Sequence, residues 1–208
     1  MRDDFTGKEA RRNPMPVNLH FDILARFYER LMPPAAADQF ALRLALPCAG
    51  ALLDAGGGTG RVSARLAPYA ARVVVCDLSL PMLRQSRRHP GLAAVQARGH
   101  RLPFADGSFE RVLVVDAVHH FQHPDRVLAE LMRVLAPGGR LVIEEPDIGR
   151  WPVRLVALAE RLALMDSHFL PPSRIAAILA SLGGRPRLAD EGRWRSWIIV
   201  DKPLPGGS

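Results

Sequence analysis

The sequence is poor in several residue types, and each scarcity narrows the class of protein. Cysteine occurs twice in 208 residues, at Cys48 and Cys76, without the pattern of a disulfide framework, so we expect buried free thiols. No unbroken apolar run approaches the ~18 residues that cross a bilayer. Residues 1–16 are polar and charged and lack the apolar core of a signal peptide. We therefore expect a cytoplasmic protein without a transmembrane segment.

Lysine is also scarce, since Lys8 and Lys202 are the two in the chain and the net charge of +7 comes almost entirely from arginine. A basic chain suggests nucleic-acid binding. The arginines are nevertheless scattered among Ala, Leu and Pro, apart from Arg11-Arg12 and the group Arg84, Arg87 and Arg88. Net charge indicates nonspecific association and not a fold or a function. Charge therefore gives little support to a nucleic-acid partner.

The most informative stretch combines a short apolar segment, an acidic residue and a run of glycines. Residues 51–53 are apolar, Asp54 follows, and Gly56-Gly57-Gly58-Thr59-Gly60 leads into a segment with apolar residues at helical spacing. The pattern predicts a strand, a tight turn and a helix. Glycine permits positive φ and close approach of a ligand to the backbone, and a helix N-terminus directs unpaired N–H groups at that ligand.

Three nucleotide-binding interpretations, and a plain glycine-rich surface turn, compete for this stretch. A Walker A loop requires Gly-Lys-Ser/Thr, but Thr59 is followed by Gly60 and Arg61. The dinucleotide fingerprint Gly-x-Gly-x-x-Gly fits poorly, because its third glycine, counted from Gly56, falls at Arg61. The spacing that fits is Asp54-x-Gly56-x-Gly58-x-Gly60.

The remaining chain alternates apolar strands with helical segments. Residues 1–16 should be poorly ordered, residues 17–202 should form a single domain, and residues 203–208 should be a loose tail. We expect helices at 19–32, 36–46, 79–88, 125–135, 151–164 and 173–182. We expect strands at 51–53, 72–77, 93–97, 111–116 and 140–145, and a hairpin of 185–190 with 194–201. Helix 19–32 carries His20 and Tyr28 and is placed to cover a ligand.

Asp77 closes the expected strand 72–77, about 17 residues beyond Gly60. In nucleotide-binding α/β folds, an acidic residue at this point accepts hydrogen bonds from ribose hydroxyls. The alternative is that Asp77 caps the following helix. Ser79 with Pro81 already supplies a helix start, so we expect Asp77 to be free for the ligand.

Several motifs in order carry a resemblance to a known family across residues 19–147. They are Leu53-Asp54-Ala-Gly-Gly-Gly-Thr-Gly60, Asp77-Leu78-Ser79, Leu102-Pro103-Phe104, His119-His120 and Leu135-Ala-Pro-Gly-Gly-Arg140. The chain resembles class I S-adenosylmethionine (SAM)-dependent methyltransferases, in the small-molecule branch of the ubiquinone/menaquinone-biosynthesis (type 11) enzymes. The resemblance implies a Rossmann-like three-layer α/β sandwich with a mostly parallel seven-stranded sheet and an antiparallel edge hairpin. It also implies SAM as cofactor and S-adenosylhomocysteine as product.

The same resemblance assigns cofactor contacts. Asp54 and Gly56 to Gly58 would line the methionine end of SAM, Asp77 would hold the ribose, and Leu78 would pack on the adenine. Other cofactor-binding candidates are Tyr28, Gly99, His100, Asp116 and Ala117. The chain departs from the family at Arg98, where an aspartate usually accepts a hydrogen bond from the adenine amino group. Arginine has no acceptor, so the backbone at Gly99 or the imidazole of His100 would have to replace it.

The chemistry implied is SN2 transfer of a methyl group from a sulfonium, in which the protein mainly aligns the reactants and excludes water. A general base helps only when the nucleophile carries a proton. His119 and His120 follow strand 111–116 and are the catalytic candidates, against the alternative that they pack locally. Together with His123 they form a group of three histidines that suggests a metal site. No cysteine or carboxylate at metal-ligand spacing supports such a site, so we expect no metal.

The acceptor should be a small, partly apolar molecule. Residues 151–208 leave little room for a substrate domain, and the loop with His168 and Phe169 lies where relatives take in substrate. Asp116-Ala-Val-His stands in place of the Asn/Asp-Pro-Pro-Tyr/Phe motif of amino-directed nucleic-acid methyltransferases. The sequence is compatible with a homodimer. A non-catalytic SAM- or S-adenosylhomocysteine-binding protein and an NAD-dependent oxidoreductase remain the alternative functions.

Overall fold

The computed structural model describes residues 37–146, 170–191 and 195–206. These residues lie within one compact unit, Ala36–Ser208. Several predictions fall outside the described residues: the poorly ordered N-terminus, the helices at 19–32 and 151–164, and the side chains of His20, Tyr28, His168 and Phe169. The boundary of the expected domain at residue 17 also falls outside them.

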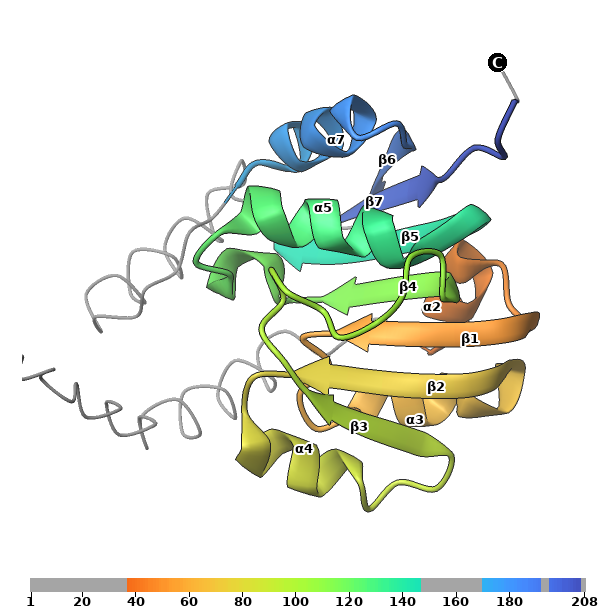
Figure 1. The fold of residues 1–208 in the computed structure, drawn as a ribbon, viewed down its shortest axis with the longest axis vertical. Coiled ribbons are helices and arrows are strands. Elements are labelled where there is room, and N and C mark those ends of the chain that lie inside the picture. The colour runs from red at the N-terminus through yellow and green to blue at the C-terminus, as the bar shows by residue number, and fades with distance from the viewer. Residues whose placement is uncertain (1–36, 147–169, 192–194, 207–208) are drawn as a thin grey trace, which may run out of the picture. The chain divides into compact units, whose positions relative to one another are not determined.

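A seven-stranded sheet forms the centre of the unit, with the order β3-β2-β1-β4-β5-β7-β6. The strands are β1 (Cys48–Ala55), β2 (Ala70–Asp77), β3 (Leu92–Gln96), β4 (Phe109–Val115), β5 (Leu135–Pro146), β6 (Arg185–Glu191) and β7 (Arg195–Asp201). The first five strands run parallel, whereas β7 is antiparallel to β5 and β6 is antiparallel to β7 (Figure 1). The predicted mostly parallel sheet with an antiparallel edge hairpin is confirmed.

Helices pack on both faces of the sheet. The α-helices are α2 (Ala37–Leu44), α3 (Arg61–Leu66), α4 (Leu80–Ser86), α5 (Pro124–Val134) and α7 (Pro172–Ser181), with short 3-10 turns η1 (Ala67–Tyr69) and η2 (Val118–His120). Figure 1 shows α5 and α7 in front of the sheet, and α2 and α3 behind it. This is the three-layer arrangement that the resemblance implied.

Continuous apolar runs form the central strands because both faces of a parallel sheet are covered. In β2, the four residues from Val73 to Cys76 are each at most 2% exposed. In β5, Leu141 and Ile143 join the core cluster that includes residues of α5 and α7. Because side chains alternate along a strand, Glu145 lies on the same face as these two residues, and Glu144 lies on the other.

Most element boundaries differ from the prediction by one or two residues, and β5 begins at Leu135, five residues before its expected start. The helix expected to reach residue 135 ends at Val134, because Leu135 adopts an extended conformation and pairs with Phe109. Lys202 Nζ donates hydrogen bonds of 2.7 Å to the carbonyls of Met132 and Leu135, which satisfies acceptors at the end of the helix. Strand β1 begins at Cys48, three residues before its expected start.

Candidate active site

The glycine loop, residues 56–60, follows β1 and precedes α3, as the sequence predicted. Gly56, Gly58 and Gly60 have φ values of 75°, 54° and 72°, a region that residues with a Cβ rarely occupy. A Cβ on Gly56 would lie 2.8 Å from the Cβ of Ala117, and one on Gly57 would overlap the carboxylate of Asp54. The loop therefore requires glycine for conformation and for space, and it brings the ends of β1 and β4 together.

Asp54 is buried beneath this loop. Its Oδ2 accepts a 2.6 Å hydrogen bond from Ser63 Oγ, while Oδ1 is buried without a hydrogen-bond partner in the part of the chain that the structure describes. Burial raises the pKa of Asp54 to about 6, the Ser63 hydrogen bond opposes that rise, and the charge of Asp77 adds to it. A buried carboxylate oxygen without a donor is costly, and a cationic ligand group would relieve that cost.

Asp77, at the end of β2, fastens the glycine loop. Its Oδ2 accepts the Gly58 N–H at 2.9 Å, and its Oδ1 accepts the Ser79 N–H at 2.7 Å. The expectation that Asp77 is free was therefore wrong, because two backbone donors lie within reach of its carboxylate. Ser79 does cap α4, with its Oγ accepting from Met82 N. Each carboxylate oxygen has a second lone pair, so the group retains acceptor capacity.

Leu78 follows Asp77 and is 59% exposed. Its carbonyl is fixed by a 2.9 Å hydrogen bond from Gln96 Nε2, so an apolar side chain projects from a fixed backbone at the carboxyl edge of β2. A flat apolar ligand would bury it. The predicted contact of Leu78 with adenine fits this exposure and stays a prediction.

The residues after β3 form a tight turn. Arg98 and Arg101 pair in an isolated antiparallel bridge, with Arg101 N donating to Arg98 O at 2.9 Å. Gly99 packs against Val127, where a Cβ would lie 3.2 Å from both methyl groups, and the His100 ring lies 5.8 Å from that of His123. This close packing against Val127 explains why a glycine occupies position 99. Replacement of the usual adenine-binding aspartate by Gly99 or His100 stays a prediction.

Two side chains of α5 hold the Leu-Pro-Phe segment that follows this turn, and sequence reasoning missed them. Glu130 Oε2 accepts the Leu102 N–H at 2.8 Å. Arg133 donates to the carbonyls of Leu102 and Phe104 at 3.1 and 2.8 Å, and it also pairs with Glu130 and Asp106. We call Glu130 and Arg133 the α5 clamp. A Glu and an Arg three residues apart on a helix indicate only a local ion pair, so their hydrogen bonds to a distant segment could not be predicted from the sequence.

The end of β4 is conformationally unusual. Asp116 has φ of 53°, which is uncommon for a residue other than glycine, and its N–H donates to the Glu144 carbonyl at 2.9 Å. Its side chain is 38% exposed. Ala117, which follows, supplies the methyl group that excludes a Cβ at Gly56. Ala117 therefore lies directly beside Gly56 of the glycine loop, and cofactor binding by Asp116 or Ala117 stays a prediction.

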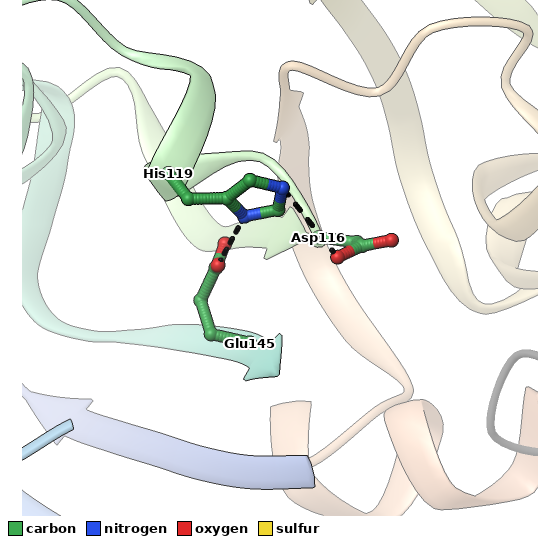
Figure 2. Close-up of side chains that lie close together, drawn as sticks. All are labelled: Asp116, His119 and Glu145. Carbon is green, nitrogen blue, oxygen red and sulfur yellow. Dashed lines mark hydrogen bonds and ion pairs between the residues drawn. The ribbon is translucent and has the colours of Figure 1, made fainter. Parts of the chain in front are cut away.

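Glu145 of β5 organises the turn that carries the two predicted histidines. Its Oε1 accepts the N–H groups of Ala117 and Val118 at 2.8 and 2.6 Å, and its Oε2 lies 2.7 Å from His119 Nδ1 (Figure 2). On its other side, His119 Nε2 lies 4.0 Å from Asp116 Oδ1. Sequence reasoning missed Glu145, although two consecutive acids at the end of an apolar strand were a signal that one of them faces the site.

The structure brings His119 and His120 together but gives them different surroundings. Their ring centroids are 4.0 Å apart, and His119 is 3% exposed, whereas His120 is an exposed residue. The surrounding protein and the adjoining His119 lower the pKa of His120, although part of the residue contacts solvent. A catalytic role for either histidine stays a prediction.

Three side chains around this turn are candidate metal ligands. Asp116, His119 and Glu145 place one ligand atom each within 4.8 Å of one another, whereas the sequence had grouped His119 with His120 and His123. Glu145 already accepts two backbone N–H groups and faces His119, so a cation there would compete with three hydrogen bonds. His119 is thus hydrogen-bonded to Glu145 and lies 4.0 Å from Asp116, and the absence of a metal stays a prediction.

Glu144 points to the opposite face of β5 and pairs with Arg195. Burial raises the pKa of Glu144 to about 7, and the nearby carboxylates of Asp116 and Glu145 add to the rise, while Arg195 opposes it.

In the part of the chain that the structure describes, no helix is long and apolar enough to span a membrane.

Comparisons with known proteins identify the family of this chain. A family model described as a methyltransferase domain matches residues 53–143. A demethylmenaquinone methyltransferase of Beutenbergia cavernae is 37% identical over 67% of this chain, and the match spans 62% of that relative, which is less than two thirds of its length. A demethylmenaquinone methyltransferase of Parafrankia sp. is 36% identical over 94% of this chain and 92% of its own.

Among solved structures, a SAM-dependent methyltransferase of Thermotoga maritima has a similar fold. The TM-score is 0.70 at 21% identity, and the match covers 88% of this chain and 98% of that one. At this level of identity the likeness concerns the fold alone. It agrees with the strand order and the antiparallel hairpin described above.

Proposed function

The chain belongs to the SAM-dependent methyltransferase family, and from that premise we propose that it methylates a small, partly apolar acceptor of the demethylmenaquinone type. The observation that carries the proposal is the cradle formed by Asp54 and the glycine loop. SAM is the methyl donor of this family, and S-adenosylhomocysteine is the product it leaves.

The cradle fits the charge of SAM. Asp54 Oδ1 is buried without a donor in the described part of the chain, and SAM carries two cationic groups, an ammonium and a sulfonium. A buried carboxylate is stabilised by an opposite charge within a few ångströms. We infer that Asp54 and Gly56 to Gly58 hold the methionine end of the cofactor.

The cradle also fits in shape. Among the described residues, a Cβ on Gly58 would have Asp77 Oδ2 as its nearest neighbour, 3.9 Å away, so these residues leave open space there that a ligand can fill. Asp77 lies across this space, with one lone pair of each oxygen committed to a backbone N–H. We infer that the remaining lone pairs accept ribose hydroxyls and that Leu78 covers the adenine.

The protein itself needs to do little bond chemistry. SAM supplies a methyl carbon already activated by the positive charge on sulfur, so alignment and exclusion of water dominate. Ala117, which packs beside Gly56, and the preceding Asp116 lead from the cofactor side into the turn with His119 and His120. We infer that the acceptor binds over this turn, at the carboxyl edge of β4 and β5, where ligands bind in open α/β sheets.

The acceptor class is supported by the relatives, which are named for demethylmenaquinone. The test is to incubate the chain with methyl-labelled SAM and a short-chain demethylmenaquinone, both oxidised and chemically reduced to the hydroquinone, and to follow the label by mass spectrometry. We expect label in the quinone and equimolar S-adenosylhomocysteine. The control is Gly58→Val, whose side chain fills the cradle and should prevent both.

The same experiment separates the alternatives. Binding of SAM and S-adenosylhomocysteine without label in any quinone would favour a non-catalytic binding protein, for which the departure at Arg98 is the supporting observation. Tight binding of NAD in place of SAM would favour an oxidoreductase and would contradict the proposal.

A further inference from the structure

We propose that Asp116, His119 and Glu145 form a proton-accepting chain that serves an acceptor with a phenolic or enolic hydroxyl. Asp116 is the catalytic residue that takes the proton, and His119 and Glu145 are positioning residues behind it. This inference rests on the proposed function, and it specifies the chemistry of the acceptor.

The three side chains are arranged from the surface into the core. The side chain of Asp116 is 38% exposed, whereas those of His119 and Glu145 are each 4% exposed. His119 stands between the two carboxylates, with Nδ1 2.7 Å from Glu145 Oε2 and Nε2 4.0 Å from Asp116 Oδ1. Figure 2 shows the second oxygen of Asp116 directed away from the imidazole. A ligand at the edge of the sheet would therefore meet Asp116 first.

Glu145 determines which nitrogen of His119 carries the proton. A carboxylate accepts hydrogen bonds and has none to donate, and both oxygens of Glu145 face donors: two backbone N–H groups on Oε1 and the His119 ring on Oε2. Nδ1 of neutral His119 is thus the protonated nitrogen, and Nε2, on the side of Asp116, is the acceptor. A histidine fixed in this way has the orientation that general-base catalysis requires.

The backbone at Asp116 supports a functional role. Its φ of 53° is strained for a non-glycine residue, and such strain persists only where surrounding contacts enforce it. Here the N–H groups of the next two residues are held by Glu145, and the N–H of Asp116 itself is held by the Glu144 carbonyl. Glu145 therefore fixes both the turn that presents Asp116 and the imidazole behind it.

The proposed reaction conserves atoms, electrons and protons. The O–H bond of the acceptor breaks, its proton passes to Asp116, and the electron pair left on oxygen activates either that oxygen or a conjugated ring carbon. The activated atom bonds to the methyl carbon, and the pair of the broken C–S bond stays on sulfur. If carbon is the nucleophile, its own proton then moves to the ring oxygen, so one proton leaves in either case. His119 Nε2 relays that proton, and the imidazolium is stabilised between the two carboxylates.

Other charged groups surround this chain. The buried Glu144 pairs with the partly exposed Arg195 on the opposite face of β5, and the charges of Asp116 and Glu145 act on Glu144. The His120 ring centroid lies 4.0 Å from that of His119, with the two rings tilted by 50°, and His120 is an exposed residue. The pH dependence of the reaction thus includes Glu144, and the variants below leave Glu144, Arg195 and His120 unchanged.

The first test needs no cofactor. In the cofactor-free protein, long-range ¹H–¹⁵N spectra of the histidine rings should show His119 protonated on Nδ1. In Glu145→Gln, the amide oxygen can still accept the two backbone N–H groups, but the amide NH₂ then faces Nδ1. The ring should therefore switch to the tautomer protonated on Nε2. An unchanged tautomer in Glu145→Gln, or an Nε2-protonated ring in the wild-type chain, would overturn the inference.

The second test measures turnover of the reduced demethylmenaquinone. We expect kcat to fall by roughly 10² or more in Asp116→Asn and in Glu145→Gln, with the SAM Kd changed by less than about threefold, because the lost proton acceptor leaves the cradle intact. Turnover of Asp116→Asn should rise with pH about tenfold per unit, since hydroxide then replaces the missing carboxylate, whereas Glu145→Gln retains Asp116 and should show a weaker rise. Glu110→Gln makes the same carboxylate-to-amide change at the amino end of β4 and should retain wild-type kcat and pH profile.

The outcomes distinguish this inference from the proposed function. If the wild-type chain methylates the quinone and Asp116→Asn keeps its kcat and pH profile, the inference fails and the proposed function stands. If the wild-type chain binds no SAM, the proposed function fails by itself. Loss of activity with a chelator and recovery with a divalent cation would assign Asp116 and His119 to a metal and would also overturn the proton chain.

Discussion

The backbone N–H of Gly58 donates a 2.9 Å hydrogen bond to Oδ2 of Asp77, so the residue that ends β2 holds the loop that follows β1. The second oxygen of Asp77 accepts the Ser79 N–H at 2.7 Å. One carboxylate therefore sets the shape of the glycine loop and the start of α4 before any cofactor binds. We infer ribose binding as a second role of Asp77, in addition to this structural one.

Asp77→Ala should consequently lose stability as well as cofactor affinity. Two backbone donors lose a charged acceptor, which costs about 1–3 kcal/mol in total at this half-buried position. We expect the SAM Kd to rise at least 100-fold, measured by calorimetry, with the unfolding free energy measured by urea titration. The side chain of Asp77→Asn can accept one of the two N–H groups, so its stability and SAM affinity should lie between those of the wild-type chain and of Asp77→Ala. Unchanged SAM affinity in Asp77→Ala would contradict the ribose assignment.

Two neighbouring glycines should respond differently to the same substitution. A Cβ on Gly57 overlaps the Asp54 carboxylate, whereas a Cβ on Gly58 meets no atom of the described residues closer than Asp77 Oδ2, 3.9 Å away. Gly57→Ala should therefore destabilise the cofactor-free protein by several kcal/mol, as overpacking does. Gly58→Ala should cost only about 1–2 kcal/mol, for its positive φ, and should mainly weaken SAM binding. Equal losses of stability and affinity in the two variants would argue against a cofactor at Gly58.

Asp54→Asn should stabilise the cofactor-free protein while it weakens SAM binding. The folded protein binds a proton at Asp54 more tightly than the unfolded chain does, because burial raises its pKa from 3.8 to about 6. The ionised carboxylate therefore destabilises the fold above pH 6, by about 3 kcal/mol at most. That penalty fades as the pH falls from about 6 to below 3.8. We expect Asp54→Asn to gain about 1–3 kcal/mol at pH 8, with no gain at pH 3.5.

The affinity for SAM should also depend on the ionisation of the Asp54 carboxyl group. If the ionised form of Asp54 attracts the cationic end of SAM, the Kd of the wild-type chain should rise as the pH falls through about 6, by up to about tenfold per pH unit. Asp54→Asn should bind SAM at least tenfold more weakly at pH 7.5 and should lack this pH dependence. Equal affinity of the two proteins at pH 7.5 would remove Asp54 from the cofactor site.

The sequence predicted the features that local chemistry determines. The positive φ values of Gly56 and Gly58 follow from glycine spacing, the buried β2 follows from its unbroken apolar run, and the start of α4 follows from Ser79 and Pro81. Each depends on residues within a few positions of one another. The order of strands, with the antiparallel hairpin at the edge, came instead from the family resemblance, since spacing along the chain leaves sheet order undetermined.

The features that the sequence missed depend on contacts between distant residues. Glu145 reaches Ala117, Val118 and His119 from a separate strand, at sequence separations of 26 to 28. Nothing in the pair Glu144-Glu145 indicates which carboxylate turns toward that segment until the register of β5 on β4 is known. The same limit explains the wrong expectation for Asp77, whose partner Gly58 lies 19 residues away.

The α5 clamp should matter for both stability and cofactor affinity. Arg133→Ala removes hydrogen bonds to the carbonyls of Leu102 and Phe104 and the ion pair with Glu130. We expect a loss of about 1–3 kcal/mol by urea titration. We also expect weaker SAM binding, because the preceding turn at Gly99 and His100 loosens. Arg126→Ala changes an exposed arginine of the same helix and should leave both quantities within experimental error. If Arg133→Ala lost stability alone, the turn would have no part in holding the adenine.

A calorimetric titration of the wild-type chain with SAM, S-adenosylhomocysteine and NAD tests the account most directly. The structure offers a buried, unpaired carboxylate oxygen of Asp54 for a cationic ligand, and NAD has no cationic methionine end to meet it. We predict that SAM and S-adenosylhomocysteine bind at one site per chain and compete with each other, with no measurable heat for NAD. Saturable binding of NAD, with no binding of SAM, would contradict the account.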